Sequence, residues 1–257
     1  MSTVLDVAIC LLLVGVAVTT LVVAVPADDE APEFGASQTA DSLGTVTASV
    51  PVTDDRHAHD TLAGHLAAAA IADVSIDGER LGTSTYPHAV RRETETRTPE
   101  RAHITVLWRP YPDAPLSGRI DVGPEPPSTA DVSVTRRTLD SGISGTDSAE
   151  SLESLAASLS IAYVTRMFPP DRTRPELVDS RTAERTAARY HAFAGALGID
   201  VGDPITEASA ERANERLADG LADRIEADLR SKYPSSTAAA NDTTAEEIEL
   251  VVRRWEP

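Results

Sequence analysis

HITVLWRP, residues 103–110, is the stretch of this chain that decides its fold class. Ile104 and Val106 alternate with His103 and Thr105, a period of two that indicates a β-strand with one buried face. Shorter strands are predicted at GRIDV (118–122) and DVSVTRR (131–137), with turn-rich segments between them. The simplest arrangement of three such strands is an antiparallel sheet.

The end of the chain carries a second copy of this signal. EIELVVRRWEP, residues 247–257, ends in Trp-Glu-Pro, which echoes the Trp-Arg-Pro at 108–110. Two similar strands with terminal tryptophans are expected to pair side by side. The sheet would then close late in the sequence.

A helix is predicted before these strands. Residues 53–76 offer Asp and Thr capping groups and then an apolar spacing typical of a helix, which ends near Val74: Leu62, Leu66, Ala69 and Ala70.

Three helices are predicted after the strands. The first opens with Asp147 and Glu150 in capping-box relation and stops at Pro169. The second has Pro175 near its start and Gly198 just past its end. The third starts at Asp203-Pro204 and carries one apolar stripe: Leu217, Leu221, Ile225 and Leu229. The predicted fold class is therefore α+β, a small antiparallel sheet packed with about four helices.

Composition restricts the partners. Asp and Glu outnumber Lys and Arg 41 to 23, the net charge is −18, and Lys232 is the only lysine. A chain this acidic lacks the basic surface that a sequence-independent nucleic-acid grip needs, so no nucleic-acid partner is expected. Scarce lysine with abundant carboxylates is typical of a high-salt proteome, and a GC-rich genome is the alternative explanation of the scarce lysine. The single cysteine, Cys10, excludes an intramolecular disulfide.

An apolar run precedes the predicted domain. Residues 7–25 carry no charge and would span about 28 Å as a helix, close to the hydrocarbon thickness of a bilayer. A cleaved signal is the alternative, but no basic residue precedes the run and its length favours a retained anchor. The sequence predicts an N-terminal transmembrane helix in a membrane anchor (1–26), a flexible acidic linker (27–52) and an extracytoplasmic α+β domain (53–257).

Few residues qualify as functional. Arg181, Arg185 and Arg189 form an i, i+4, i+8 stripe beside Arg172 and Arg174, which would be either a docking face for an acidic partner or a solvated helix face.

Other signals are weaker. Asn241-Asp242-Thr243 is a glycosylation acceptor triplet if the domain lies outside the cell. His57, His59 and His65 do not have the i, i+4 spacing of helical metal ligands, so they are expected to be surface histidines and no metal is expected. No P-loop, dinucleotide fingerprint or nucleophile elbow is present. The sequence thus offers no catalytic or cofactor-binding residues, and the chain is predicted not to be an enzyme.

Two stretches carry a resemblance, STVLDVAICLLLVGVAV (2–18) and WRPYPDAPLSGRIDVGPEPPSTADVSV (108–134). They resemble an uncharacterised family of halophilic archaea whose members have one N-terminal membrane helix and are similar to pilin-like or TadE-like accessory proteins of type IV pilus-related secretion systems. The resemblance implies no catalytic motif. It implies an envelope role beside an assembly ATPase and a polytopic platform protein.

Asp6 is the residue to which this resemblance gives a role. After removal of Met1 it would be the fifth residue, the position at which pilin-like subunits carry a carboxylate that pairs with a neighbour's N-terminal amine. The chain departs from the pilin pattern because Asp replaces Glu and no basic-glycine cleavage site precedes the run. A carboxylate that lies in the headgroup region or caps the helix is the alternative.

The expected function is that of a non-catalytic, membrane-anchored, single-pass accessory or minor pilin-like subunit of an archaeal type IV pilus-like or secretion assembly. Its expected partners are the membrane and other envelope subunits. The alternative is a secreted or anchored protein that binds a solute or a surface and acts alone.

Overall fold

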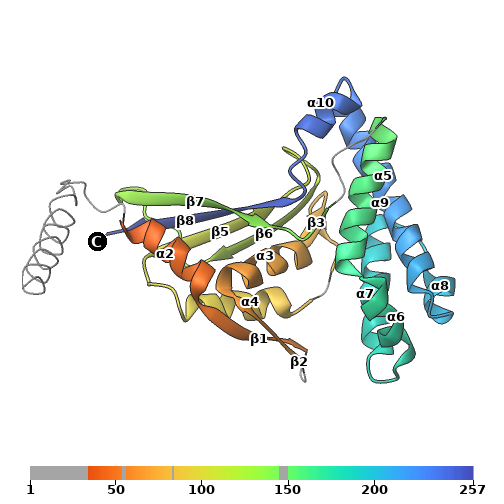
Figure 1. Ribbon diagram of the computed structural model, residues 1–257, viewed down its shortest axis with the longest axis horizontal. Helices are drawn as coiled ribbons and strands as arrows, with labels where there is room; N and C mark the ends of the chain where they lie inside the picture. The colour runs from red at the N-terminus through yellow and green to blue at the C-terminus, as the bar shows by residue number, and fades with distance from the viewer. Residues whose placement is uncertain (1–33, 54–55, 83, 145–149, 257) are drawn as a thin grey trace, which may run out of the picture. The chain divides into compact units, whose positions relative to one another are not determined.

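A six-stranded antiparallel sheet is the centre of the computed structural model, which describes residues 34–53, 56–82, 84–144 and 150–256 (Figure 1). The strand order is β4-β3-β6-β5-β8-β7. The strands are β3 (Val74–Ile76), β4 (Glu79–Arg80), β5 (Ala102–Trp108), β6 (Leu116–Val122), β7 (Val132–Asp140) and β8 (Glu247–Trp255). The α+β class and the antiparallel sheet are confirmed.

The predicted pairing of the two tryptophan-ended strands is also confirmed. β8 pairs antiparallel with β5 in a register that places Thr105 opposite Val251, and it pairs with β7 on its other side. Because the strands run in opposite directions, Trp108 and Trp255 lie at opposite ends of the pair. The last strand of the chain therefore fills the gap between two earlier ones.

The two faces of the sheet differ in polarity. One face carries fully buried apolar side chains, among them Ile104, Val106, Ile120, Leu250 and Val252. The opposite face carries charged and hydroxyl groups from the same strands, because alternate residues of a strand point to opposite sides. Only the apolar face requires a cover of helices.

Three helices and a hairpin lie on the apolar face (Figure 1). Helix α2 (Phe34–Thr45) contacts β7 and β8, α3 (Leu62–Ala72) contacts β5 and β6, and α4 (Tyr86–Glu95) contacts β6. The hairpin consists of β1 (Thr47–Thr53) and β2 (Arg56–Thr61), which pair antiparallel in a separate two-stranded sheet. These elements form the first layer on the sheet.

A helical bundle lies between β7 and β8 in the sequence. It contains α5 (Leu152–Met167), α6 (Pro170–Val178), α7 (Ala183–Leu197), α8 (Gly202–Thr206), α9 (Ala210–Lys232) and α10 (Ser236–Asn241). Helix α5 packs along α9. The predicted stripe of α9 is confirmed, since all four of its members are 0% exposed.

The expected flexible linker (27–52) was wrong for residues 34–52. These residues form α2 and most of β1, and residues 34–257 belong to one compact unit. Ala36, Ala40 and Leu43 recur at helical spacing and are buried. The folded domain therefore includes residues from Phe34 onward and does not begin at residue 53.

Several helix boundaries also differ from the prediction. The helix expected from residue 53 begins at Leu62, because residues 56–61 form β2 and Thr61 caps the helix by accepting the N–H of Gly64. The capping box of α5 uses Ser151 and Ser154. The predicted second helix is two helices, α6 and α7, and α4 was not predicted. The described residues form nine helices where about four were expected.

The predicted membrane anchor is not covered by these observations. Residues 7–25 and Asp6 lie outside the described residues. Within the described ranges, no helix combines the length and the apolar character needed to cross a membrane.

Candidate functional site

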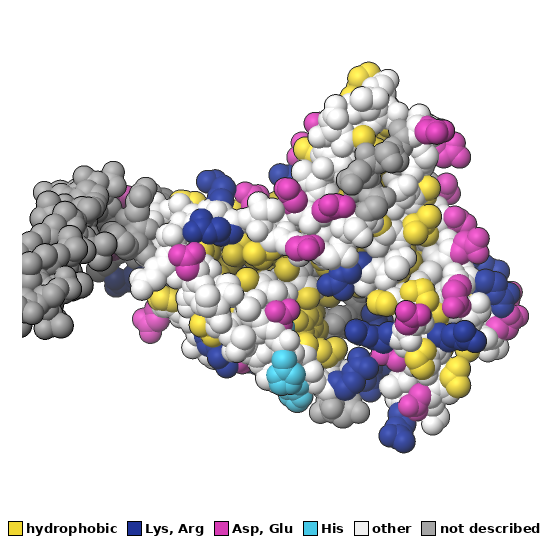
Figure 2. Space-filling model, in the orientation of Figure 1, with side chains coloured by type: hydrophobic (Ala, Val, Ile, Leu, Met, Phe, Trp, Pro, Cys, Tyr) yellow, Lys and Arg dark blue, Asp and Glu magenta, His cyan; other side chains and the backbone are white. Residues whose placement is uncertain are grey.

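A cleft of about 620 Å³ lies where the hairpin and α3 face the helices α6 and α7. Figure 2 shows Lys and Arg side chains gathered in this region, where the β1–β2 hairpin faces α6 and α7. The volume lies within the range of roughly 300–1,000 Å³ that is common for ligand sites. We define the arginine cleft by these lining residues: Arg56, Arg166, Arg172, Arg185 and Arg189 with Glu176, over the apolar side chains of Val52, Ala68, Ile71, Ala72, Met167 and Ala188.

The charge of the arginine cleft is opposite to that of the chain. Five guanidinium groups and one carboxylate, Glu176, are the charged groups among its described lining residues. The chain as a whole carries −18. The arginines come from four elements, β2, α5, α6 and α7. The fold therefore gathers positive charge at one place in an acidic protein, and this favours an anionic occupant.

Glu176 is held by both walls of the cleft. Its Oε1 accepts a hydrogen bond from Nη1 of Arg56 at 3.1 Å, and its Oε2 accepts one from the Thr186 hydroxyl at 3.3 Å. The Glu176 side chain is 15% exposed and that of Arg56 is 52% exposed. The carboxylate of Glu176 therefore already pairs with one arginine of the cleft, Arg56. Through this pair and Thr186 it links β2 to α6 and α7.

Arg189 is fixed before any occupant arrives. Its Nη2 donates to the carbonyl of Met167 at 3.1 Å, and its guanidinium lies 5.0 Å from the centre of the Phe168 ring. Burial lowers the pKa of Arg189, partly opposed by the carboxylate of Glu176. The group remains a cation near neutral pH, because an arginine pKa starts above 12. A fixed, partly desolvated guanidinium presents its remaining donors without further loss of side-chain freedom.

Arg172 and Arg185 differ from Arg189 in being exposed. Neither side chain has a hydrogen-bond or ion-pair partner within the described ranges. Their charges are available to a group that enters the cleft.

A buried tyrosine–histidine pair closes one side of the cleft. Tyr86 lines the cleft, and its hydroxyl lies 2.7 Å from Nδ1 of His65, whose Nε2 lies 3.1 Å from the carbonyl of Ala48. A carbonyl only accepts, so Nε2 is assigned the proton and Nδ1 accepts from the Tyr86 O–H. Burial, and next the charge of Asp60, raise the pKa of Tyr86 to about 12. The cleft therefore presents a neutral phenol here.

The predicted arginine stripe is only partly one face. Arg185 and Arg189 line the cleft together with Arg172, whereas Arg174 and Arg181 are exposed outside the lining. Arg181 does not share the face of Arg185 and Arg189 because α7 begins only at Ala183. Arg181 lies in the preceding turn, where the Asp179 side chain accepts its backbone N–H.

Arg56 and Arg166 were not predicted as site residues. They lie far from α7 in the sequence, and no local pattern connects them to it. Arg166 donates to the carbonyl of Ser141 at 3.2 Å, which holds it at the end of α5.

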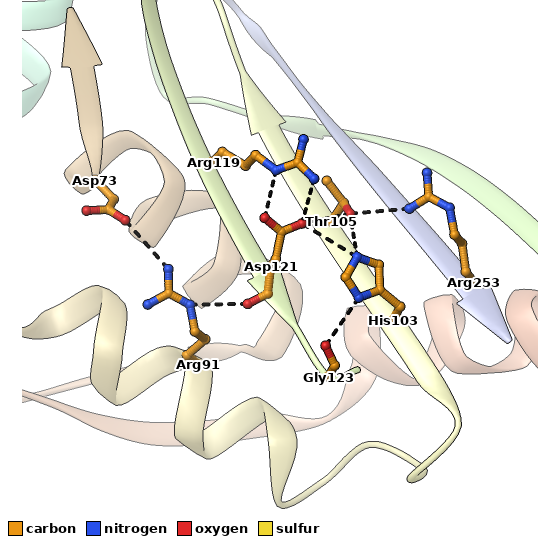
Figure 3. A network of polar contacts seen from close by, with 8 residues as sticks. All are labelled: Asp73, Arg91, His103, Thr105, Arg119, Asp121, Gly123 and Arg253. Atoms are coloured by element: carbon orange, nitrogen blue, oxygen red, sulfur yellow. Dashed lines mark hydrogen bonds and ion pairs between the residues drawn. The ribbon is translucent and has the colours of Figure 1, made fainter. Parts of the chain in front are cut away.

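A second polar cluster lies on the face of the sheet opposite the helices (Figure 3). Arg119 holds the Asp121 carboxylate with two hydrogen bonds of 2.7 and 2.9 Å, and the Thr105 hydroxyl donates to the same carboxylate at 3.0 Å. Arg253 donates to Thr105 at 3.3 Å, and Nδ1 of His103 lies 3.2 Å from the carbonyl of Gly123. Nε2 of His103 lies 3.3 Å from the Thr105 hydroxyl, so five strand residues and one loop carbonyl form one connected network.

The network matches the geometry of a catalytic relay only in part. In such a relay a base takes the hydroxyl proton and a carboxylate orients that base. Here the hydroxyl of Thr105 lies 3.3 Å from Nε2 of His103, but it donates to Asp121 at 3.0 Å. Nδ1 of His103 faces the carbonyl of Gly123 and not a carboxylate. Burial alone would raise the pKa of Asp121, but hydrogen bonds from Arg119 and Thr105 outweigh it and hold the pKa below its ordinary value. The cluster fixes the pairing of β5, β6 and β8.

The histidine prediction holds for two residues of three. His57 and His59 lie exposed on β2, whereas His65 is 1% exposed and was wrongly expected at the surface. It is buried because it sits on the apolar side of α3 and both ring nitrogens find partners there. The described residues contain no group of three or more His, Cys, Asp or Glu side chains placed to hold a metal ion.

Asn241 is exposed at the end of α10. The hydroxyl of Thr243, the third residue of the acceptor triplet, donates to the carbonyl of Ala239 at 3.2 Å. An exposed asparagine is accessible to a modifying enzyme, so its glycosylation remains a prediction.

Comparisons with known proteins place the chain in a family. No curated protein and no solved structure matches it. One family model does match, over residues 5–255, and its description, a family of unknown function, carries no pilin-like or TadE-like assignment. Because the match covers nearly the whole length, the chain belongs to the family DUF7284.

Proposed function

We propose that this chain is a non-catalytic accessory subunit of an envelope assembly and that its arginine cleft docks an acidic surface of a neighbouring subunit. One observation carries the proposal, namely five arginines that line one cleft together with a single carboxylate in a chain of net charge −18. Guanidinium groups bind carboxylates bidentately and are enriched at interface hot spots.

A protein partner is favoured over a nucleic acid. A phosphate polymer longer than the cleft would meet the acidic surface around it, and the net charge of the chain repels such a polymer. A protein surface, unlike a phosphate polymer, can place its carboxylates opposite the arginines of the cleft and nowhere else in the interface. The cleft then selects a partner by local charge, while the acidic surface elsewhere repels other acidic molecules.

Membrane attachment is the second part of the proposal. Residues 7–25 would hold the chain in the membrane with its α+β domain outside the cell, as their length and lack of charge favour. Within such an assembly, Asp6 would pair with a neighbour's N-terminal amine, in the manner of the pilin-like proteins that the N-terminal stretch resembles. Asp6→Ala should then abolish co-purification of partner subunits without releasing the chain from membranes.

The docking role is tested by a matched pair of double variants. Arg172→Gln with Arg185→Gln removes the two unpaired cations of the cleft, and Arg174→Gln with Arg181→Gln makes the same charge change just outside it. Partner subunits that co-purify with the full chain from membranes are identified and quantified by mass spectrometry. The cleft variant should lose about 90% or more of a partner that the control retains. Equal recovery from both variants would contradict the docking role.

A solute-binding protein that acts alone is the second candidate function. The same convergence of polar groups over apolar side chains favours it, because small-molecule sites combine these features. In that case no partner subunit would depend on Arg172 and Arg185, and a small anion would bind to the chain with those two residues as determinants.

A further inference from the structure

We infer that the occupant of the arginine cleft is an extended acidic peptide segment, with at least two carboxylates flanking an apolar side chain, and that Glu176 competes with it. The inference rests on the proposed function and names the partner chemistry. Four features of the cleft carry it.

The cleft holds more cations than one anionic group can pair with, five arginines in all. Arg185 and Arg189 lie one helical turn apart on α7, about 6 Å between their β-carbons. Arg56 lies on the hairpin wall, where it is bound to Glu176. A single carboxylate is satisfied by one or two guanidinium groups. The occupant therefore carries several anionic groups at separate positions.

The floor between the cations is apolar. Ile71, Ala72 and Met167 line it together with Val52, Ala68 and Ala188. A free anion such as phosphate would leave this surface in contact with water. An occupant that places an apolar side chain there gains the free energy of removing both surfaces from water.

Hydroxyl groups at the margin suit a peptide backbone. Ser84 and Thr85 line the cleft, and a hydroxyl both donates and accepts hydrogen bonds. The hydroxyl of Thr182, which lines it too, already donates to the carbonyl of Glu176 at 2.7 Å and remains an acceptor. A backbone offers one donor and one acceptor at every residue, unlike a carboxylate, which only accepts. An extended segment therefore fits the cations, the floor and the margin together.

Glu176 reveals how the cleft binds a carboxylate. It already receives hydrogen bonds from Arg56 and from Thr186, the pattern expected for a partner's Asp or Glu. An incoming carboxylate near Arg56 must share that cation with Glu176, and the two like charges repel. Glu176 therefore lowers the affinity for the acidic segment, and a neutral isostere should raise it.

The test uses defined probes and the purified full chain in detergent. A fluorescent peptide of alternating Asp and Leu is titrated, with the matched Asn and Leu peptide as a neutral control and succinate as a small competitor. The Asp peptide should bind at least about tenfold more tightly than the Asn peptide. Arg172→Gln with Arg185→Gln should weaken it about tenfold or more, and Arg174→Gln with Arg181→Gln should leave it unchanged.

Glu176→Gln gives the sharpest readout, since it should strengthen binding of the Asp peptide about threefold or more. A merely structural role of Glu176 predicts the reverse, because loss of its pair with Arg56 would loosen the cleft. Weaker binding in Glu176→Gln, or equal binding of the Asp and Asn peptides, would overturn the inference. So would succinate if it displaced the peptide at the peptide's own concentration, which would identify a small dicarboxylate as the occupant.

The two proposals fail in distinguishable ways. If peptides do not bind but partner capture still depends on Arg172 and Arg185, the partner docks through a folded surface and only the peptide inference is wrong. If neither peptide binding nor capture depends on these arginines, the docking role itself is wrong.

Discussion

Trp108 of β5 stacks on Tyr163 of α5, with ring centroids 5.3 Å apart and ring planes inclined by 16°. The indole N–H of Trp108 donates to the carbonyl of Ala245 at 2.8 Å, and the hydroxyl of Tyr163 donates to the carbonyl of Ile71 at 3.3 Å. Ile71 lies in the floor of the arginine cleft. This stack therefore joins the sheet, α3 and the helical bundle at the point where the two walls of the cleft meet.

Loss of the stack should be costly. Trp108 is 1% exposed, so Trp108→Ala is expected to lower the free energy of unfolding by about 3–5 kcal/mol through lost burial and a cavity. Val134, on β7 of the same sheet, is 43% exposed, and Val134→Ala should change it by no more than about 0.5 kcal/mol. Chemical denaturation followed by circular dichroism measures both. Similar costs for the two variants would show that the stack does not join the layers.

Gly118 makes a close approach that no other residue permits. A β-carbon there would lie 2.0 Å from the carbonyl oxygen of Ala70 and 2.8 Å from a methyl group of Val74. Gly118→Ala should therefore destabilise the domain by about 1–3 kcal/mol or prevent folding, because α3 must move off the sheet.

The control substitution is expected to change the stability of the domain in the opposite direction. Gly195 lies inside α7 with no atom within 4 Å of the added β-carbon. Gly195→Ala should stabilise the domain by about 0.5–1 kcal/mol, since alanine favours the helix interior. Thermal unfolding of the two variants beside the wild type separates the predictions. A neutral Gly118→Ala would contradict the packing of α3 against β6.

The phenol of Tyr86 gives a pH dependence. Its pKa is about 12 in the folded chain against 10.0 ordinarily, so folding favours the protonated form. The resulting contribution to stability is fully present below about pH 10 and is lost as the pH rises through about 12. Tyr86→Phe should abolish this contribution, and the difference in phenolate absorbance between wild type and variant should show one group titrating near pH 12. A difference curve centred near pH 10 would contradict the burial of this hydroxyl.

The strands of the sheet could be predicted because their burial pattern is local. Ile104 and Val106 alternate with polar neighbours, and Leu250 and Val252 repeat the pattern near the end of the chain. Helix α2 gave no such signal, because its buried positions are mainly the small residues Ala36 and Ala40 and the segment contains glycines. Strand β2 (RHAHDT) has no apolar alternation at all, and it is a strand because it pairs with β1.

The site could be predicted only where its residues share a helix. Arg185 and Arg189 lie at helical spacing and were expected on one face, and both line the cleft. Arg56 and Arg166 join them only after the hairpin and α5 have packed against the rest of the domain. The pair of His65 with Tyr86 depends in the same way on the contact between α3 and α4.

Site-specific photocrosslinking in native membranes shows whether an acidic partner segment occupies the arginine cleft. A photoreactive residue replaces Ala188, in the floor of the cleft, or Val178, which is 71% exposed and lies outside the lining. We expect a partner adduct from position 188, attached to a segment rich in Asp and Glu. The adduct should be lost when Arg172 and Arg185 are changed to Gln, and position 178 should give none. No adduct from position 188, or an adduct that survives loss of both arginines, would contradict occupancy of the cleft by such a segment.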